Sequence, residues 1–379
     1  FMLKKIILPH LVIALISLQN VLAQKLSHSN PTKETKALYQ NLHALSKKYV
    51  LFGHQDDLAY GVGWKYQEGR SDVKETTGDY PAVYGWDIGR IEHGSANNID
   101  GVPFEKMKTY IKAGYERGAV ITISWHFDNP LTGGSSWDTT RNTVKAILPT
   151  GDKHELYKQW LDKAANFLLS LKGPKGEYIP VLFRPFHELT GRWFWWGSNT
   201  TTPTEMKEIW QFTTDYLRMT KKIDHLIMVY NTNDFKTEAD FLRSYPGDDY
   251  VDVLSFDTYQ FDLKKKENFI QEIKRQSEIV AKLAAEKNKL AAFAETGFEN
   301  VPDPNWWTGT LWPAIKDYPL SYVLVWRNAG YMPSSKKMHY YAPYKGGISA
   351  EDFKRFSQNP KVLLEKKLRN KKIYQNQTN

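Results

Sequence analysis

The stretch Val181–Gly197, VLFRPFHELTGRWFWWG, decides how this chain of 379 residues is interpreted. An apolar, strand-like run ends in the motif RPFHE, and an aromatic cluster, Trp193–Trp196, follows at once. Such an acid beside several tryptophans is typical of a carbohydrate cleft, where an indole stacks on a sugar ring and the acid protonates the glycosidic oxygen. The common hydrolytic mechanism needs a second carboxylate. The stretch Leu290–Gly297, LAAFAETG, offers one, Glu295, near the end of another apolar run.

Eight short apolar runs of this kind are spread along the chain. As strands we expect Val50–Gln55, Ala82–Ile88, Val120–Phe127, Pro180–Glu188, Leu226–Asn233, Val251–Gln260, Leu290–Gly297 and Tyr322–Ala329. Helical patterns lie between most of them, at Pro103–Arg117, Lys153–Leu171, Pro203–Lys222, Thr237–Tyr245, Lys266–Lys287 and Asn305–Lys316. Continuous apolar strands separated by helices indicate a parallel sheet that helices cover.

Eight such units match a (β/α)₈ barrel in number and in size. A doubly wound open sheet is the alternative, but no GxGxxG motif follows any of the strands. We therefore predict an α/β fold, a TIM barrel in a single domain over residues 24–379. A helix before the first strand, Glu34–Ser46, and two short helices within Ser349–Lys371 complete it.

Residues 1–23 have the pattern of a secretory signal peptide. Lys4 and Lys5 precede the mostly apolar run Ile6–Leu18, and Val21 and Ala23 place small residues before a cleavage site. The segment is too short for a membrane span. Because the chain has no cysteine, it has no lipid-anchor site and no disulfide or thiol chemistry. We expect a periplasmic or extracellular protein that is free of the membrane after cleavage.

The net charge of +9 says little about the partner. Much of the excess lies in Lys264–Lys266, Lys336–Lys337 and the tail Lys366–Lys372, where no base-stacking aromatics are interleaved. These runs are typical of solvated faces, so we expect no nucleic-acid partner. We expect a monomer whose partner is a carbohydrate.

In a barrel the active site lies at the carboxyl ends of the strands. Glu188 follows the fourth predicted strand and Glu295 ends the seventh, so the two carboxylates are expected to face each other across the mouth. A pair about 5–5.5 Å apart makes one carboxylate a nucleophile and the other an acid/base. A salt bridge of Glu188 to Arg184 or Arg192, or a capping role for Glu295, is the structural alternative.

Other polar residues at strand ends fit around this pair. His187 is expected to hydrogen-bond the nucleophile, and Tyr259 to donate to it and keep it ionised. Asp257, two residues before Tyr259 on the same strand face, is expected to orient a neighbour and is counted among the substrate-binding residues. Arg327, beside Trp326, is expected to fix a hydroxyl or carboxyl group of the substrate.

Metal-dependent hydrolysis is the main competing chemistry. His54, Asp56, His126 and Asp128 stand at strand ends, but the chain has neither HxH after the first strand nor HExxH. It also lacks the GxSxG elbow of serine hydrolases. We therefore predict catalysis by carboxylates alone, with no metal and no cofactor.

The motifs RPFHE, WFWWG, AETGF, SWHF, FDTYQ and VWRNA together resemble those of glycoside hydrolase family 26, most closely its β-1,4-mannanase branch. The resemblance extends from LFGHQDDLAYG at residue 51 to the tail DFKRFSQNP. It implies a (β/α)₈ barrel and retention of anomeric configuration. One departure is local: the family commonly has Met-Asn after the acid/base, and this chain has Leu189 and Thr190.

The same resemblance implies roles for single residues. Glu188 matches the acid/base and Glu295 the nucleophile. His187 and Tyr259 match positions beside the nucleophile, and Trp193 matches one beside the cleaved sugar. His126 and Trp137, and more loosely Glu92, match positions on the non-reducing side. Trp326 and Arg327 match a substrate-contacting pair.

Mannan, galactomannan or glucomannan is the substrate that the resemblance favours, with mannobiose as the expected product. The loops Asp56–Tyr80 and Gly89–Val102 carry polar and aromatic residues that can close the cleft after two sugars. Lichenan and β-1,3-xylan are the alternatives within the same family. A catalytically silent sugar-binding barrel is the alternative of another class, and the presence of both glutamates argues against it.

Overall fold

The computed structural model describes residues 26–376, and the signal peptide predicted for residues 1–23 lies outside them. Eight parallel strands follow one another around a closed barrel, because each pairs with the next and the last pairs with the first. They are β1 (Val50–Gln55), β4 (Val83–Asp87), β5 (Val120–Ser124), β6 (Val181–Arg184), β7 (Leu226–Thr232), β8 (Val253–Gln260), β9 (Leu290–Phe298) and β10 (Leu320–Val325). The predicted fold is confirmed.

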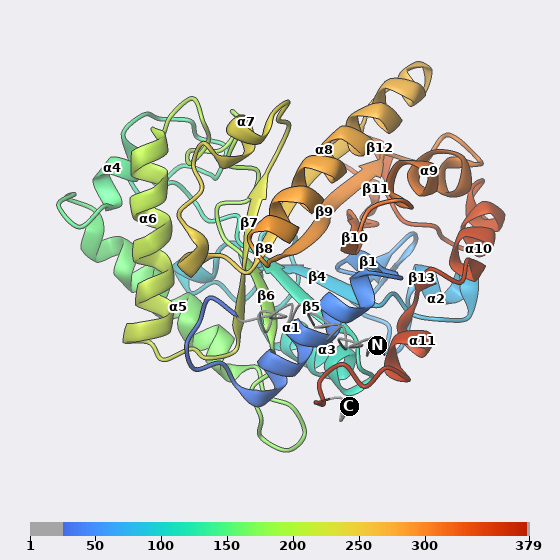
Figure 1. Cartoon of the computed structure of the whole chain (residues 1–379), viewed down its shortest axis with the longest axis horizontal. Coiled ribbons are helices and arrows are strands. Elements are labelled where there is room, and N and C mark those ends of the chain that lie inside the picture. The colour runs from blue at the N-terminus through green and yellow to red at the C-terminus, as the bar shows by residue number, and fades with distance from the viewer. Residues whose placement is uncertain (1–25, 377–379) are drawn as a thin grey trace, which may run out of the picture.

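Helices surround this barrel (Figure 1). They are α1 (Lys33–Ser46), α2 (Asp72–Thr77), α3 (Phe104–Glu116), α4 (Thr143–Ile147), α5 (His154–Ser170), α6 (Pro203–Asp215), α7 (Glu238–Leu242), α8 (Lys266–Glu286), α9 (Trp312–Ile315), α10 (Ala350–Gln358) and α11 (Glu365–Arg369). The sequence pattern did not predict α2 or α4, each of which is a short helix. The helix expected over Asn305–Lys316 is a π-helical turn, Trp307–Leu311, followed by α9.

Strand residues alternate between the barrel interior and the helix layer. One buried apolar cluster contains residues from all eight strands, which fill the interior, together with residues of α1 and of the C-terminal segment. Its strand members include Leu51, Val83, Val120, Leu182, Val229, Val253, Ala292 and Leu324. Their strand neighbours, such as Phe52 and Phe183, belong to the larger cluster beneath the helices. This period of two is what a barrel wall imposes.

The alternation carries polar side chains inward at the carboxyl ends of the strands. On six of the strands, the residue that faces the interior near the carboxyl end is polar. These residues are Gln55, Asp87, Ser124, Arg184, Asn231 and Asp257. All six are buried. The interior is therefore apolar toward the amino ends of the strands and polar at the mouth, where TIM barrels hold their active sites.

A β-bulge in β9 turns Glu295 into this polar ring. Leu290, Ala292 and Ala294 face the interior, so strict alternation would point Glu295 outward. The pairing with β8 steps from Phe256↔Phe293 to Asp257↔Glu295, which inserts one extra residue in β9. Because a bulge shifts the side-chain parity by one, Glu295 faces inward beside Asp257.

Two short hairpins join the loops at one side of the mouth. The hairpin β2 (Tyr60–Gly61) and β3 (Trp64–Lys65) follows β1, and the hairpin β11 (Gly330–Met332) and β12 (Lys337–His339) follows β10. A Cβ at Gly330 would lie 3.5 Å from the carbonyl oxygen of Gly61, so the two hairpins pack against each other. In addition, the Tyr66 hydroxyl donates a 2.6 Å hydrogen bond to the Gly101 carbonyl in the loop after β4.

The C-terminal segment is fastened to the outside of the barrel. A short strand, β13 (Val362–Leu363), pairs with the start of β1. Glu365, fully buried, accepts hydrogen bonds from Arg117 at 2.8 Å, Tyr84 at 2.9 Å and Arg369 at 2.9 Å. This carboxylate therefore ties α11 to β4 and to the end of α3.

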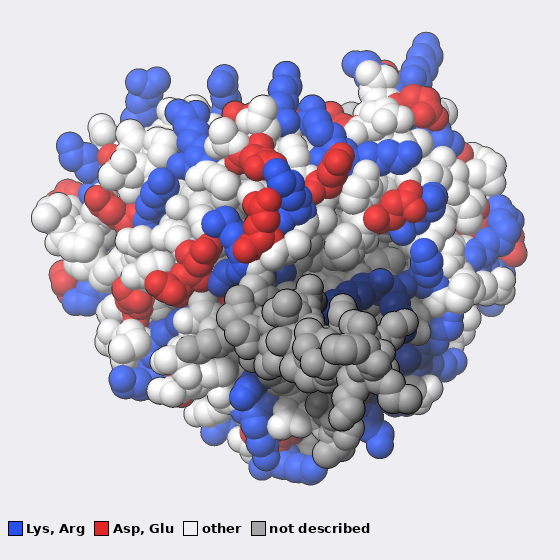
Figure 2. Space-filling view, viewed as in Figure 1, with Lys and Arg blue, Asp and Glu red and all other residues white. Residues whose placement is uncertain are grey.

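The visible surface carries mixed charge. On the face shown in Figure 2, lysines and arginines alternate with aspartates and glutamates across the upper part of the molecule. Within residues 26–376, no helix combines the length and the apolar character that crossing a membrane requires.

Candidate active site

Glu188 stands in a strained turn directly after β6. The predicted strand continued to Glu188, but the observed strand ends at Arg184, because Pro185 has no N–H for the ladder. Phe186 (φ 50°) and Glu188 (φ 53°) then take left-handed backbone conformations, which non-glycine residues adopt only where the surroundings hold them. Two contacts hold this turn: the Glu188 N–H donates to Asn231 Oδ1 at 2.7 Å, and Trp196 Nε1 donates to the His187 carbonyl at 2.8 Å.

Glu188 and Glu295 face each other at the centre of the mouth. One carboxylate oxygen from each, together with one from Asp257, lies within 4.8 Å of the others. Both side chains are almost fully buried, with 9% of Glu188 and 4% of Glu295 exposed. This spacing is that of a retaining carboxylate pair and leaves no room for the water that an inverting enzyme places between its carboxylates.

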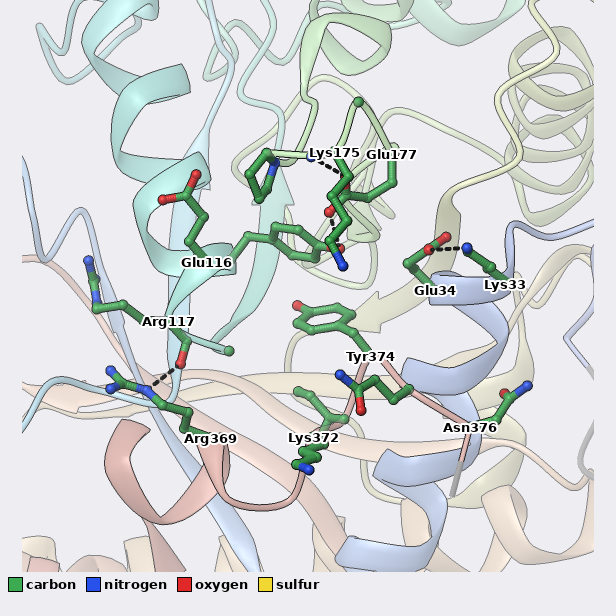
Figure 3. Close-up of a pocket in the computed structure, with 16 residues that line it drawn as sticks. Lys33, Glu34, Glu116, Arg117, Lys175, Glu177, Arg369, Lys372, Tyr374 and Asn376 are labelled. Atoms are coloured by element: carbon green, nitrogen blue, oxygen red, sulfur yellow. Dashed lines mark hydrogen bonds and ion pairs between the residues drawn. The ribbon is translucent and has the colours of Figure 1, made fainter. Parts of the chain in front are cut away.

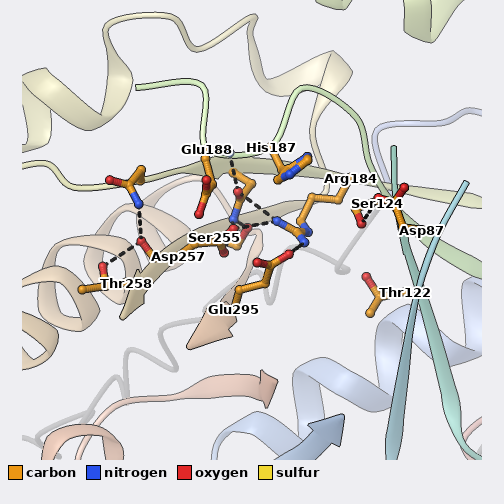
Figure 4. A network of polar contacts seen from close by, with 12 residues as sticks. Asp87, Thr122, Ser124, Arg184, His187, Glu188, Ser255, Asp257, Thr258 and Glu295 are labelled. Carbon is orange, nitrogen blue, oxygen red and sulfur yellow. Dashed lines mark hydrogen bonds and ion pairs between the residues drawn. The ribbon is translucent and has the colours of Figure 1, made fainter. Parts of the chain in front are cut away.

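A buried arginine holds the nucleophile candidate. Arg184 forms ion pairs with both Asp257, at 2.7 Å, and Glu295, and it also donates to Asn231 Oδ1 at 3.1 Å (Figure 4). Tyr259 donates a 2.9 Å hydrogen bond to the other oxygen of Glu295. Arg184 and Tyr259 therefore hold both oxygens of the Glu295 carboxylate in place, as the positioning of a nucleophile requires.

The acid/base candidate has the opposite surroundings. Burial, and then the negative charge of Glu295, raise the pKa of Glu188 to about 7. The Trp193 indole opposes this by donating a 2.7 Å hydrogen bond to Glu188 Oε2. One carboxylate is thus paired with a cation while the other is kept protonated near neutral pH, which is the division of roles that acid/base catalysis needs.

His187 does not contact the nucleophile as the sequence predicted. Its Nε2 lies 3.0 Å from Nε2 of His126, whose Nδ1 lies 2.7 Å from Asp87. Burial lowers the pKa of His126, but the Asp87 carboxylate outweighs it and the net shift is upward. Burial and then the charges of His126 and Arg184 lower the pKa of His187. Of these two imidazoles, His126 therefore binds a proton more readily, and Arg184 takes the place at Glu295 that His187 was expected to fill.

Aromatic side chains surround His126. Trp137 stacks on its imidazole with 5.5 Å between ring centroids, and Trp326 lies 6.3 Å away. Trp137 is 50% exposed, and Trp193, beside Glu188, is 38% exposed. Trp193 therefore lies beside Glu188 and Trp137 beside His126, and both present open ring surface.

Arg327 lies farther along the same side of the mouth. Its Nε is 3.2 Å from Asp100 Oδ1 after β4, and its Nη1 is 3.5 Å from the Tyr60 hydroxyl after β1. A hollow of about 610 Å³ opens there, lined by these three residues together with Trp64 and Tyr331. Arg327 thus joins the loops that the sequence predicted would close the cleft.

Two of the predicted substrate contacts have other partners. Glu92 is fully buried, and its carboxylate accepts hydrogen bonds from Trp125 Nε1 at 3.0 Å and from the Asp128 N–H at 2.8 Å. The side chain is therefore committed to fixing the loops after β4 and β5. Asp257 is likewise fully buried under Arg184, so it positions the site rather than facing a sugar.

The four side chains considered for a metal site do not form one group, although ligand atoms of Asp128, Glu92 and His93 lie within 4.8 Å of one another. His54 pairs with Asp57 at 2.6 Å, His126 with Asp87, and Asp128 with His93 at 2.9 Å. The oxygens of Glu188, Asp257 and Glu295 are close enough to share a cation. However, the guanidinium of Arg184 already lies against two of them and supplies the positive charge there.

Two residues of the site were missed. Arg184 was considered only as a salt-bridge partner of Glu188, and Asn231 was not considered. Asn231 accepts from Glu188 N and Arg184, and its Nδ2 donates to Asp257 at 2.8 Å and to Ser255 at 3.0 Å. A polar residue at an inward position of the predicted strand Leu226–Asn233 was the available signal.

A separate cavity of about 810 Å³ lies at the other end of the barrel (Figure 3). It is lined by the end of α3, the loop before β6 and the C-terminal segment, including Arg117, Lys175 and Tyr374. These elements lie at the amino ends of the strands, and none of the predicted site residues lines the cavity. Within residues 26–376, the predicted catalytic pair therefore lies at the mouth, apart from this cavity.

With this geometry established, comparison with known proteins identifies the family. The family described as glycosyl hydrolase family 26 matches residues 27–300. A family 26 β-mannanase from Bacteroides ovatus superposes with a TM-score of 0.86 at 45% identity, covering 91% of this chain and 98% of that one.

Two further relatives are much longer than the region they share with this chain. A mannan endo-1,4-β-mannosidase of Bifidobacterium adolescentis is 31% identical over 361 residues, which are 90% of this chain and 36% of that protein. A mannan endo-1,4-β-mannosidase of Bacillus subtilis strain 168 is 32% identical over 199 residues, 49% of this chain and 52% of that protein. The chain thus spans about a third and about half of these relatives. The matched residues, the closed barrel and the paired glutamates agree: the chain belongs to glycosyl hydrolase family 26.

Proposed function

We propose that the protein is a retaining β-1,4-mannanase that hydrolyses mannan, galactomannan or glucomannan by double displacement. The observation that carries this proposal is the contrast between the two carboxylates, Glu295 ion-paired with Arg184 and Glu188 buried with its pKa raised to about 7. Substrate identity rests on the relatives, which are mannanases by name.

In the first step Glu295 attacks the anomeric carbon and Glu188 donates its proton to the glycosidic oxygen, so the leaving chain departs as an alcohol. The Glu295 charge is then lost in the ester. Because that charge helps to raise the pKa of Glu188, the pKa falls and Glu188 accepts a proton from the incoming water. Arg184 and Tyr259 stabilise Glu295 again when it leaves.

Substrate choice is tested by reducing-sugar release from mannan, glucomannan, lichenan and β-1,3-xylan under one set of conditions. Activity on the two mannans, with little on lichenan and xylan, is expected. A preference for lichenan or β-1,3-xylan would assign the chain to another activity of the same family. Absence of activity on all four, with sugar binding retained, would favour the non-catalytic barrel.

The chemistry proposed here needs no metal. Full activity after exhaustive chelation is expected because Arg184 supplies the positive charge beside Glu295. A loss of activity that a divalent cation restores would contradict catalysis by carboxylates alone.

We further propose mannobiose as the main product. The hairpins β2–β3 and β11–β12 pack together, and Arg327 links them to Asp100, so three loops meet on the side of the mouth beyond His126. A time course on mannohexaose and on polymeric mannan tests this. Early mannobiose with a slow fall in viscosity supports closure, whereas mixed long products and a rapid fall in viscosity contradict it.

Secretion is proposed on the sequence pattern of residues 1–23 alone. Expression of the full chain in a Gram-negative host, followed by N-terminal sequencing of the periplasmic and extracellular protein, tests it. A mature N-terminus at Gln24 is expected, and a protein that stays in the cytoplasm with residues 1–23 attached would contradict it.

A further inference from the structure

The exposed aromatic side chains of this protein gather at the barrel mouth. Among the large apolar side chains of residues 26–376 that are substantially exposed, four are aromatic: Trp137, Trp193, Phe261 and Tyr331. Each follows the carboxyl end of a barrel strand, β5, β6, β8 and β10 respectively. Trp137 and Trp193 already have roles beside the catalytic pair. Phe261, at 88% exposed, is the most open of the four and has none.

Phe261 is close to the catalytic centre. Its ring centroid lies 6.4 Å from that of Tyr259, whose hydroxyl donates to the nucleophile Glu295. Side chains two residues apart share one face of a strand, and Asp257 and Tyr259 of β8 point to the inside of the mouth. Phe261 comes two residues after Tyr259 and continues this face. The ring therefore lies next to Tyr259, at the exposed rim of the mouth.

The position of β8 in the barrel decides which part of the substrate meets Phe261. The resemblance places His126 and Trp137, which follow β5, on the non-reducing side. Trp326, which follows β10, lies 6.3 Å from His126 between ring centroids, so the same side extends over β10, β1, β4 and β5, four consecutive strands in the closed order. Glu188 after β6 and Glu295 on β9 bound the other half. Phe261 after β8 therefore lies in that second half, where the chain beyond the cleaved bond must leave.

The backbone on both sides of Phe261 is anchored. Gln260 accepts a 2.9 Å hydrogen bond from Trp306 Nε1 and donates one of 3.2 Å to the Asp262 carbonyl. Asp262 accepts a 2.8 Å hydrogen bond from the Lys264 N–H and begins a short 3₁₀ turn. An exposed aromatic ring on a fixed backbone loses little conformational entropy when a ligand covers it.

We propose that Phe261 is the stacking platform of a subsite for a sugar on the leaving-group side of the cleaved bond, an assignment that rests on the proposed function. The ligand is a pyranose ring of the β-mannan chain, whose C–H face covers the open ring. The same subsite binds the acceptor when a second oligosaccharide replaces water. The acceptor hydroxyl then attacks the anomeric carbon of the Glu295 ester, Glu188 takes the hydroxyl proton, and the Glu295 carboxylate leaves.

The test compares Phe261→Ala with wild type on two substrates. Mannohexaose has sugars on both sides of the cleaved bond, whereas an aryl β-mannobioside has none on the leaving side. Covering about 50 Å² of apolar ring surface corresponds to roughly tenfold in kcat/KM. A loss of about that size on mannohexaose, with the aryl glycoside unchanged, is expected. Phe261→Trp should retain the wild-type value, and Tyr331→Ala, which removes an exposed aromatic ring on the other side, should not show this pattern.

The ratio of transfer product to hydrolysis product supplies an independent measurement. With the aryl β-mannobioside as donor and mannotriose as acceptor, the ratio of transfer to hydrolysis should fall several-fold in Phe261→Ala and remain in Phe261→Trp. Equal losses on both substrates, or no loss on mannohexaose and no change in the ratio, would overturn the subsite. Failure of the proposed function is distinguishable, because wild type would then not cleave mannohexaose.

Discussion

The indole N–H of Trp193 donates a 2.7 Å hydrogen bond to Oε2 of Glu188, and it thereby stabilises the ionised form of the group that we propose as the acid. The bond lowers the pKa of Glu188, against burial and the charge of Glu295, which raise it to about 7. In the proposed mechanism the tryptophan therefore has two roles: it lies beside the sugar, and its hydrogen bond adjusts the pKa of Glu188.

Trp193→Phe keeps an aromatic ring and removes the donor, so we expect the pKa of Glu188 to rise. Because the first step needs protonated Glu188, kcat/KM falls above that pKa, and the alkaline limb should begin near pH 7 in wild type and at higher pH in the variant. The pH dependence of kcat/KM checks this. Trp137→Phe, which alters a tryptophan that stacks on His126, should leave the limb in place. An equal shift in both variants, or none in Trp193→Phe, would contradict the role of the hydrogen bond.

Glu188→Gln is expected to stabilise the protein above neutral pH. Glu188 has a folded-state pKa of about 7 against an ordinary value of 4.5, so the folded state binds its proton more tightly than the unfolded chain. The stability that this proton confers is fully present below pH 4.5 and is lost as the pH rises through 7. Thermal unfolding should therefore show a higher Tm for the variant than for wild type at pH 8, with the difference shrinking toward pH 4. The exposed Glu351→Gln serves as control, and a difference that does not depend on pH would contradict the raised pKa.

Tyr259→Phe and Arg184→Lys should both slow the chemical step, by different amounts. Loss of the 2.9 Å hydrogen bond from Tyr259 removes one of the donors to Glu295 and should lower kcat by about ten- to a hundredfold. Arg184→Lys cannot reproduce the fork that reaches Glu295 and Asp257 together, so a larger loss and a lower Tm are expected. Steady-state kinetics and thermal unfolding measure both. An Arg184→Lys enzyme with wild-type kcat would show that this arginine does not position the nucleophile.

Glu365→Ala tests the attachment of the C-terminal segment. Its removal leaves Arg117 and Tyr84 without their buried acceptor, so a loss of roughly 3 kcal/mol in the free energy of unfolding is expected. Denaturant titration measures it. Glu351→Ala, which breaks an exposed pair with Lys354, should change the value by less than about 1 kcal/mol. Equal effects of the two variants would contradict the role given to Glu365.

Much of the barrel was predictable because its strands are apolar on both faces and its helices carry clear periodic patterns. All eight strands were located, and the largest errors in their bounds lie at the carboxyl ends. At these ends the backbone stops pairing with the neighbouring strands and forms the loops of the site, as where β6 ends before Pro185. The short helices α2 and α4 were missed because five or six residues are too few to show a helical period.

The two glutamates were predictable from type and place, but the way Glu295 faces the cleft was not. Alternation from Leu290 points it outward, and only the bulge against β8 reverses it. The hydrogen-bond partners of the buried Asp257 carboxylate could not be predicted either, because Arg184, Asn231 and Asp257 belong to three different strands that only the fold brings together. Sequence patterns show which face of a strand is buried, and they do not show which neighbour satisfies a buried charge.

The stereochemistry of azide rescue tests the central assignment most directly. Glu188→Ala and Glu295→Ala are each incubated with azide and an activated aryl β-mannobioside, and the glycosyl azide is identified by NMR. Without Glu188, the Glu295 ester still forms and azide displaces it, which gives the β-azide. Without Glu295, azide attacks the substrate directly and gives the α-azide. This pair of products is the result that the account predicts; an α-azide from Glu188→Ala or a β-azide from Glu295→Ala would contradict it.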